Sequence, residues 1–357
     1  MKKIKVGVLG ATGAVGQLYI HLLRDHPWFE VTFLAASKES ENYRIAVSER
    51  GWFMPEDIPE YVKKMKVWAA SDVVKAKTLC DFVFSALDST PAQQLERAYA
   101  IHDIPVVSNA SAYRWDNYVP VIMPEINADH IKIIPHQRKT YYFDKGFIVT
   151  KPNCSLQSYM MPIYALIKEG YSIDKVVVTT LQASSGAGRP GVPSLDLIDN
   201  IVPYISGEEE KSEHEPKKIL GKVTTKGIKN YKGLKISATC TRVPVRDGHT
   251  ASVNFSFKGK KPSVEKIIDI WENFRGLPQD ASLPSAPKQP IIYRQEDNRP
   301  QPVLDRMADN GMAITVGRLR HCPVFDYKFV CLSHNTIRGA AGGGILNAEL
   351  LMTEEYL

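Results

Sequence analysis

The stretch Ile4-Lys-Val-Gly-Val-Leu-Gly-Ala-Thr-Gly-Ala-Val-Gly16 decides the fold of this chain. Residues 4–9 are mostly apolar and predict a short buried strand, and a helix with spaced apolar residues follows the glycines. Glycines at such a turn let the backbone approach a pyrophosphate, which then lies at the positive end of the helix. The predicted cofactor contacts in this turn are Gly10, Thr12, Gly13, Ala14, Val15 and Gly16.

The spacing of these glycines is G-x-x-G-x-x-G, whereas the usual dinucleotide-binding spacing is G-x-G-x-x-G. The prediction of a nucleotide site therefore depends on the strand before the turn and the helix after it. A glycine-rich turn without a ligand is the alternative.

The alternation of strands and helices continues through the first half of the chain. Residues 31–36, 81–86 and 104–108 read as strands, and a helical segment begins near Pro91. This rhythm predicts an α/β fold with a Rossmann-type, doubly wound parallel sheet that binds a dinucleotide.

The pattern changes after residue 154 to segments that alternate like strands of an antiparallel or mixed sheet with one covered face. These strands are expected at 175–182, 234–239, 251–257 and 327–332, and helices near 194–203, 208–220 and 262–274. The stretch 278–302 holds six prolines and reads as an ordered extended arm. A glycine-rich helix at 335–351 could fold back on the first domain, so the second domain is predicted to be α+β.

The end of the second strand indicates which nicotinamide dinucleotide is bound. It reads Ala35-Ala36-Ser37-Lys38, without the carboxylate that usually binds the ribose 2′-hydroxyl of NAD. A hydroxyl and a cation suit a 2′-phosphate, which favours NADP with Ser37 and Lys38 as contacts. Glu39 weakens this interpretation, and Lys38 at the start of a solvated loop is the alternative.

Cys154 is the candidate nucleophile. It follows the apolar run 147–150 in Pro152-Asn153-Cys154-Ser155 and precedes a helix-like stretch that closes at Gly170. A cysteine at a helix N-terminus is expected to favour the reactive thiolate. A small buried cysteine without chemistry is the alternative.

A second segment with chemical potential is Arg242-Val-Pro-Val-Arg-Asp-Gly-His249. An imidazole titrates near neutrality and is the usual partner of a thiol in proton transfer. An arginine presents a planar fork that matches a carboxylate. The segments 108–114, 182–188 and 208–211 read, taken alone, as structure.

Composition excludes several classes of function. The 357 residues are enough for about two domains, and the net charge of +6 is not concentrated in a stripe, so nucleic-acid binding is not expected. No apolar stretch approaches the roughly 20 residues of a membrane span. The five cysteines form no C-x-x-C pair, and no secretory segment is recognised, so free thiols in the cytoplasm and no metal site are expected.

Taken in order, these segments resemble the aspartate-semialdehyde dehydrogenase family, in the form found in archaea and fungi. The resemblance runs essentially end to end, and seven motifs in fixed order are far more specific than any one. The segments are Gly10–Gly16, Asn109–Arg114, Pro152–Ser155, Gln182 with Ser185–Gly188, Pro203–Lys211, Arg242–Thr250 and Leu332–Gly342.

The resemblance implies a reductive step on an acyl phosphate. Cys154 would attack the β-carbonyl of L-4-aspartyl phosphate, phosphate would leave, and the thioester would accept hydride from NADPH to give L-aspartate 4-semialdehyde. His249 would be the acid/base, Gln182 would orient the acyl group, and Asn153 is carried over as a catalytic residue. This reaction belongs to the biosynthesis of lysine, threonine and methionine.

The resemblance also implies binding roles. Arg242 would bind the substrate α-carboxylate, Glu208 the α-amino group, and Arg114 with Lys211 the departing phosphate. Further cofactor contacts would be Ser185, Gly186 and Asn335.

The same resemblance implies an organisation into two domains and a homodimer or homotetramer. Residues 1–153, completed by the C-terminal helix 337–357, would bind NADP, and residues 154–336 would form the catalytic and dimerisation domain. Arg189 and Arg246 are departures, at places where less charge is expected.

Other functions stay open at this point. Malonyl-CoA reductase is a close relative that uses the same cysteine on a CoA thioester, with no phosphate to expel; Arg114, Lys211 and the segment 242–249 favour the aspartyl enzyme. N-acetyl-γ-glutamyl-phosphate reductase is more distant. A non-catalytic nucleotide-binding regulator would be expected to lack Cys154 or His249.

Overall fold

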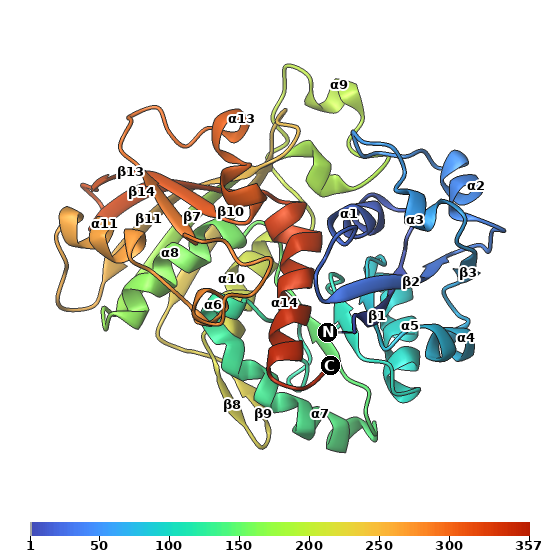
Figure 1. Cartoon of the computed structure of the whole chain (residues 1–357). Helices are drawn as coiled ribbons and strands as arrows, with labels where there is room; N and C mark the ends of the chain where they lie inside the picture. Colours follow the sequence, from blue (N-terminus) through green and yellow to red (C-terminus); the bar gives the residue numbers. More distant parts are fainter. Residues whose placement is uncertain (1) are drawn as a thin grey trace.

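Two six-stranded sheets form the framework of the protein, and a computed structural model describes residues 2–357 (Figure 1). The first sheet has the strand order β3-β2-β1-β4-β5-β6, and every neighbouring pair is parallel. Its strands are β1 (Ile4–Leu9), β2 (Phe29–Ala36), β3 (Val67–Ala69), β4 (Phe82–Ser85), β5 (Val106–Ser108) and β6 (Ile148–Thr150). The predicted doubly wound parallel sheet is confirmed, with small shifts at strand ends.

Apolar residues on both faces of this sheet explain the helices that cover it. The longer ones are α1 (Ala14–Leu22), α4 (Val73–Leu79), α5 (Ser89–Ile101) and α7 (Ile134–Tyr141). The C-terminal helix α14 (Gly342–Thr353) contributes Ile345 and Leu350 to the same core as Val6 and Val8. Figure 1 shows α14 (red) running between the two sheets.

The turn between β1 and α1 requires glycine at two positions. Gly10 has φ +74° and a Cβ there would lie 2.7 Å from the carbonyl oxygen of Ala86. A Cβ on Gly16 would lie 2.1 Å from the carbonyl oxygen of Gly10. The helix therefore starts directly against the end of β1, which directs its N-terminus toward the carboxyl edge of the sheet.

The second sheet is mixed and has the order β10-β7-β11-β14-β13-β12. Its strands are β7 (Ile173–Gln182), β10 (Lys235–Arg242), β11 (His249–Phe257), β12 (Ile291–Arg294), β13 (Ile314–His321) and β14 (Tyr327–Ser333). The helices α8 (Gln157–Lys168) and α11 (Val264–Glu272) cover one face, where Trp271 stacks edge-on against Phe329. The other face is partly open, since Val177 and Leu181 of β7 are more than one-third exposed. The predicted mixed-sheet domain is confirmed.

Three sequence-based expectations about individual elements were wrong in extent. The helix expected at 194–203 is only the single turn α9 (Ser194–Leu197), after which the chain extends and Val202 pairs with Arg242. The expected arm 278–302 contains the edge strand β12, because Ile291 is fully buried in the core and pairs in parallel with β13. The helix expected from residue 335 starts as a π-helical turn, η4 (Ile337–Ala341).

The helix expected at 208–220 is confirmed as α10 (Glu208–Ile219). The remaining elements are α2 (Tyr43–Ser48), α3 (Glu60–Lys63), α6 (Pro124–Asn127), η1 (Ala128–Ile133), η2 (Ser184–Ala187), β8 (Lys222–Thr224), β9 (Gly227–Lys229), α12 (Leu277–Asp280), α13 (Pro302–Asp305) and η3 (Ala308–Gly311). Between residues 2 and 357 no helix is long and apolar enough to cross a membrane.

Candidate active site

Cys154 lies in the turn that joins β6 to α8, at the boundary between the two sheets. The helix itself begins three residues later, at Gln157, so the thiol precedes the first turn and does not cap it. A Cβ on Gly339 of η4 would lie only 2.7 Å from the Cβ of Cys154, so the C-terminal segment closes tightly over the cysteine. The Sγ of Cys154 is 3.3 Å from Nε2 of His249.

His249 begins β11 and is held in one orientation by the backbone. The amide N–H of Ala183 donates to its Nδ1 at 3.0 Å, so Nδ1 must be the unprotonated nitrogen. The single proton of the neutral ring then resides on Nε2, which faces the thiol. Burial lowers the pKa of His249 to about 3, and the charges of Arg242, His334 and Lys151 act in the same direction.

This arrangement differs from the acid/base role expected for His249. A neutral ring with Nε2–H can donate a hydrogen bond to sulfur or to a carbonyl oxygen, but it has no free lone pair to accept the thiol proton. Nε2 can accept a proton only if the ring proton first moves to Nδ1, and that move breaks the hydrogen bond from the Ala183 N–H. In the resting geometry His249 is a hydrogen-bond donor.

The environment of the Cys154 thiol also differs from the expected one. Burial raises the pKa of Cys154, and the carboxylate of Glu208 raises it further. Lys151, Arg114 and Arg242 lower it. Burial therefore opposes the thiolate, and ionisation depends on these neighbouring cations.

The carboxylate of Glu208, at the start of α10, connects three of the expected site residues. Asn153 Nδ2 and Lys211 Nζ contact its Oε1 at 2.8 and 3.0 Å, and Gln182 Nε2 donates to its Oε2 at 3.2 Å. Gln182 is almost fully buried at the end of β7. Four expected site residues from three separate segments therefore form one network beside Cys154.

Glu215, further along the same face of α10, holds two loops close to the cysteine. It accepts hydrogen bonds from the backbone N–H of Asn153 at 2.7 Å and from Arg114 Nη1 at 3.0 Å. Sequence reasoning missed Glu215, although its spacing of seven from Glu208 puts both on one helical face. Arg114 is thus held close to the Cys154 loop.

Arg242 is the buried site cation whose guanidinium binds only a backbone carbonyl. Its Nη1 donates to the carbonyl oxygen of Ala183 at 2.8 Å, and it forms no ion pair within residues 2–357. A Cβ on Gly186 would lie 2.8 Å from that Nη1 and 3.0 Å from His249 Nε2. The glycine loop after β7 therefore borders both side chains, and the remaining donors of Arg242 are available for an anion.

The other predicted cofactor contacts, Ser185, Gly186 and Asn335, lie in this loop or next to it. Asn335 donates from Nδ2 to Ser185 Oγ at 2.8 Å, and its Oδ1 accepts from the backbone N–H of Gly248 at 2.8 Å. Asn335 thereby joins the loop after β7 to the turn before His249.

At the far end of the nucleotide site, the structure adds a cation that sequence reasoning missed. Arg50 donates from Nη2 to Ser37 Oγ at 3.0 Å, whereas Lys38 is exposed. The Glu39 carboxylate lies 3.5 Å from Lys66 Nζ. This ion pair partly neutralises the negative charge of Glu39, which would otherwise repel a phosphate at Ser37. No sequence signal links Arg50 to Ser37, because the loop between them sets their contact.

The two charged departures contact groups outside the catalytic network. Arg189 stacks its guanidinium 4.6 Å from the ring centre of Phe53, and Arg246 pairs with Asp247 at 2.8 Å. No group of three or more metal-ligating side chains occurs in the part of the chain that the structure describes.

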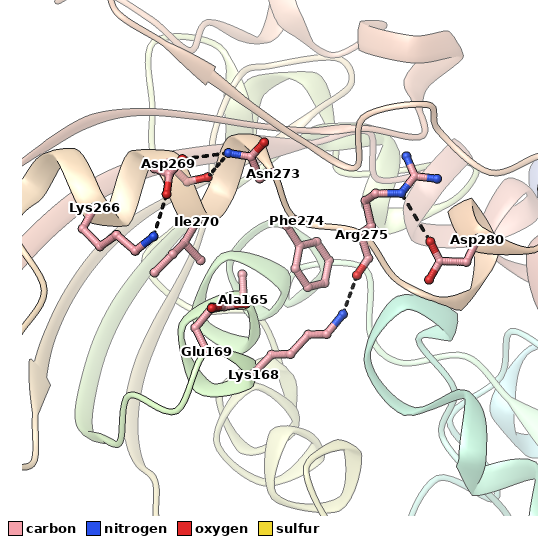
Figure 2. Close-up of a pocket in the computed structure, with 10 residues that line it drawn as sticks. All are labelled: Ala165, Lys168, Glu169, Lys266, Asp269, Ile270, Asn273, Phe274, Arg275 and Asp280. Atoms are coloured by element: carbon pink, nitrogen blue, oxygen red, sulfur yellow. Dashed lines mark hydrogen bonds and ion pairs between the residues drawn. The ribbon is translucent and has the colours of Figure 1, made fainter.

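A separate surface hollow of about 240 Å³ lies between α8 and α11 (Figure 2). Most of its charges already have partners: Lys266 binds Asp269 at 2.7 Å, and Arg275 binds Asp280 at 3.3 Å. Lys168 donates to the carbonyl oxygen of Arg275 at 2.6 Å. The hollow does not include Cys154, and Glu169 is its one charged lining residue whose carboxylate has no protein partner in residues 2–357.

Comparison with known families agrees with the two-sheet architecture. The family model described as "Semialdehyde dehydrogenase, NAD binding domain" matches residues 5–134, and that described as "Semialdehyde dehydrogenase, dimerisation domain" matches residues 163–338. The fold is thus that of a semialdehyde dehydrogenase, an oxidoreductase class.

Full-length relatives define the family further. Aspartate-semialdehyde dehydrogenase of Cryptococcus neoformans is 46% identical over 98% of this chain and 96% of the relative. That of Archaeoglobus fulgidus is 43% identical over 99% of this chain and 100% of the relative. The crystal structure of the Candida albicans enzyme with NADP is 40% identical, with a TM-score of 0.91 over 99% of this chain and 100% of that one. The chain belongs to the aspartate-semialdehyde dehydrogenase family.

Proposed function

We propose that the protein reduces L-4-aspartyl phosphate to L-aspartate 4-semialdehyde and phosphate with NADPH, reversibly, through a thioester on Cys154. The observation that carries this proposal is the 3.3 Å contact between Cys154 Sγ and His249 Nε2, beside a buried Arg242 that has no carboxylate partner. A nucleophile, a hydrogen-bond donor and an anion-binding fork are the groups that an acyl transfer on an anionic substrate needs.

In the proposed first step, the Cys154 thiolate attacks the acyl carbon. The C–S bond forms, the C–O bond to phosphate breaks, and the phosphate leaves with the bonding pair and takes up a proton. His249 donates its Nε2–H to the developing oxyanion, and Gln182 orients the acyl group.

In the second step, NADPH, when bound, supplies a hydride to the thioester carbon. The resulting oxyanion collapses, the C–S bond breaks and the thiolate of Cys154 is restored. No proton has to move to or from His249 in this direction, which is consistent with its fixed Nε2–H tautomer. Its proposed role is that of a neutral donor.

Substrate recognition is proposed to follow the charges around Cys154. Arg242 would bind the α-carboxylate and Glu208 the α-amino group, while Arg114 and Lys211 would bind the phosphate. Asn153 would hold Glu208 in place through its 2.8 Å hydrogen bond. The ion pairs of Arg114 with Glu215 and of Lys211 with Glu208 fix these cations before substrate binds.

NADP is the proposed cofactor, and the residues present fit it. A Cβ on Gly13 would meet only the carbonyl oxygen of Gly10, at 3.4 Å, so this part of the turn faces open space that a pyrophosphate could occupy. Ser37 and Arg50 would bind the 2′-phosphate. The similar Candida albicans enzyme was crystallised with NADP, which supports the same choice here.

We further propose that residues 1–153 with the C-terminal helix 337–357 form the cofactor domain, and residues 154–336 the catalytic and dimerisation domain. The core shared by α14 and the first sheet supports this division. A homodimer or homotetramer is proposed from the partly open face of the second sheet, in the region that matches the dimerisation-domain model. The reaction would serve lysine, threonine and methionine biosynthesis.

The function is tested by the oxidation of aspartate semialdehyde with NADP, with and without phosphate. NADPH formation should be sustained only with phosphate and should be absent in Cys154→Ala. Malonyl-CoA with NADPH, run in parallel, should give no turnover. Reduction of malonyl-CoA without phosphate-dependent oxidation of the semialdehyde would overturn the proposal.

A further inference from the structure

Glu96 of α5 is a buried carboxyl group that the mechanism above does not use. Its side chain is fully enclosed where α5 packs against β5. Its Oε1 accepts a hydrogen bond from Ser108 Oγ at 2.6 Å, whereas its Oε2 has no hydrogen-bond partner within residues 2–357. Burial raises the pKa of Glu96 to about 7. Because burial of a carboxyl group costs free energy, one that has a single hydrogen bond is a candidate for a functional role.

Ser108, the last residue of β5, connects this carboxyl group to the loop that follows the strand. Its Oγ donates to Glu96 and accepts from the backbone N–H of Ala110 at 3.0 Å. A hydroxyl group has one proton, so with this proton directed to the carboxyl group a lone pair of the oxygen faces the amide. A protonated carboxyl group still accepts through its carbonyl oxygen, so the arrangement does not depend on the charge of Glu96. The two hydrogen bonds form a link between the loop and α5, the Ser108–Glu96 link.

The peptide group between Asn109 and Ala110 joins this link to Arg114. Its N–H donates to Ser108 Oγ, and its C=O, on Asn109, accepts from Arg114 Nη2 at 2.8 Å. Because a peptide group is planar, a rotation that moves its N–H away from Ser108 also moves its C=O away from Arg114. The guanidinium is held by this bond and by the 3.0 Å bond from its Nη1 to Glu215. The Ser108–Glu96 link therefore fixes one of the two directions in which Arg114 is held.

The rest of the loop is held by contacts that do not involve the link. The backbone N–H of Asn109 donates to the carbonyl oxygen of Ser85 at 3.0 Å, and Lys218 Nζ donates to the carbonyl oxygen of Arg114 at 2.7 Å. Both contacts use the backbone of the loop, so they remain when the side chain of Glu96 is changed. Loss of the link should therefore change the direction of the guanidinium without unfolding the loop.

We propose that Glu96 and Ser108 are positioning residues that orient Arg114 for the phosphate group. They act through the peptide group between Asn109 and Ala110, because both side chains are fully enclosed by protein. The proposal rests on the proposed function, in which Arg114 binds the phosphate. It predicts that changes at these two buried positions weaken phosphate binding selectively and leave the binding of the other two substrates unchanged.

The test is the steady-state oxidation of aspartate semialdehyde with NADP by the full-length chain, with inorganic phosphate as the varied substrate. Ser108→Ala removes the acceptor of the Ala110 N–H and should raise the KM for phosphate at least about tenfold, as expected for a lost hydrogen bond at a charged group. The KM values for NADP and the semialdehyde, and kcat at saturating phosphate, should stay within about twofold of wild type.

Two substitutions of Glu96 test the other end of the link. Glu96→Leu removes the acceptor of the Ser108 hydroxyl and should raise the KM for phosphate at least about fivefold. Glu96→Gln keeps an acceptor oxygen at the same reach and should stay within about twofold of wild type. Rescue by glutamine would show that hydrogen bonding, and not the charge of Glu96, orients the loop.

Ser85→Ala is the matched control. Ser85 is fully buried at the end of the neighbouring strand β4, and its Oγ has no hydrogen-bond partner within residues 2–357. The variant loses the same hydroxyl group as Ser108→Ala but keeps the backbone carbonyl that accepts from Asn109. It should leave the KM for phosphate unchanged. Urea unfolding of both serine variants separates a general loss of stability from the selective effect.

Hydrogen exchange of the backbone amides gives a readout that needs no turnover. In wild type and in Ser85→Ala the Ala110 N–H should be protected, as followed by mass spectrometry on peptides that cover the loop. Ser108→Ala should lose the protection of about one amide.

Three outcomes would overturn the proposal. They are an unchanged KM for phosphate in Ser108→Ala, a Glu96→Gln variant as impaired as Glu96→Leu, and KM values for NADP and the semialdehyde that rise as much as that for phosphate. Sustained oxidation of the semialdehyde by wild type without phosphate would instead refute the proposed function, and with it the role in phosphate binding. Amide exchange would still report in that case whether Ser108 holds the peptide group, so the two failures are distinguishable.

Discussion

Replacement of His249 distinguishes a hydrogen-bond donor from an acid/base. In the structure its Nε2–H faces Cys154 Sγ at 3.3 Å, and its Nδ1 accepts from Ala183 at 3.0 Å. A hydrogen bond to a charged partner contributes roughly 1.5–3 kcal/mol, and each ~1.4 kcal/mol changes a rate about tenfold. His249→Ala should therefore lower kcat by about 10- to 150-fold.

His249→Gln keeps an N–H donor at nearly the same reach and should retain kcat within about tenfold of wild type. Both variants leave the Ala183 N–H without its acceptor, which should lower the free energy of unfolding by roughly 1–3 kcal/mol. Because the pKa of His249 is lowered to about 3, the ring is already neutral above pH 5, and its titration should not appear in the kcat profile between pH 5 and 9.

Steady-state kinetics of the two variants, with urea unfolding as the check on folding, measures these effects. If His249→Gln is as slow as His249→Ala and both lose more than about 10³-fold, proton exchange is required and the donor role is refuted.

Three further substitutions test the cofactor site, the substrate site and a buried ion pair. Arg50→Ala should raise the KM for NADP more than that for NAD, because it removes the charge beside Ser37; equal effects on the two cofactors in steady-state assays would contradict this. Arg242→Lys should raise the KM for the semialdehyde strongly, with a fall in kcat if the acyl carbon moves by about 1 Å, and an unchanged KM would remove Arg242 from substrate binding. Arg338→Met should destabilise the protein by roughly 3–5 kcal/mol in urea unfolding, since it leaves Glu125, now bonded at 2.6 Å through both oxygens, buried without its partner. A loss below about 1 kcal/mol would contradict that reasoning.

Regular features of the sequence were enough to predict most of the fold. The strand at 4–9, the glycine turn and the parallel strands that follow depend on local apolar patterns, which are strong signals. The helix expected at 194–203 and the arm expected at 278–302 were wrong in extent, because tertiary contacts determine the backbone conformation of both segments. Val202 pairs with Arg242, and Ile291 fills the core beside β13.

The site was predictable only in part. Cys154 and His249 are 95 residues apart and meet because the turn after β6 and the start of β11 come together, which local patterns do not reveal. The buried Lys151 could not be inferred, because lysine is normally exposed. Arg50 depends on a loop conformation that no sequence motif fixes.

The thiolate predicted for Cys154 depended on a helix N-terminus that the structure puts three residues later. The cysteine instead lies in a buried site where its pKa is raised. That site, and not the helix dipole, determines which neighbours must hold its charge.

The proposed mechanism requires Cys154 to carry the acyl group between the reduction and the phosphate steps. Aspartate semialdehyde mixed rapidly with NADP in the absence of phosphate should give a burst of about one NADPH per chain and then stop, because the thioester has no acceptor. Addition of phosphate should restore turnover, and Cys154→Ala should give no burst. Steady NADPH formation without phosphate, or turnover with phosphate in the Cys154→Ala variant, would contradict a thioester on Cys154.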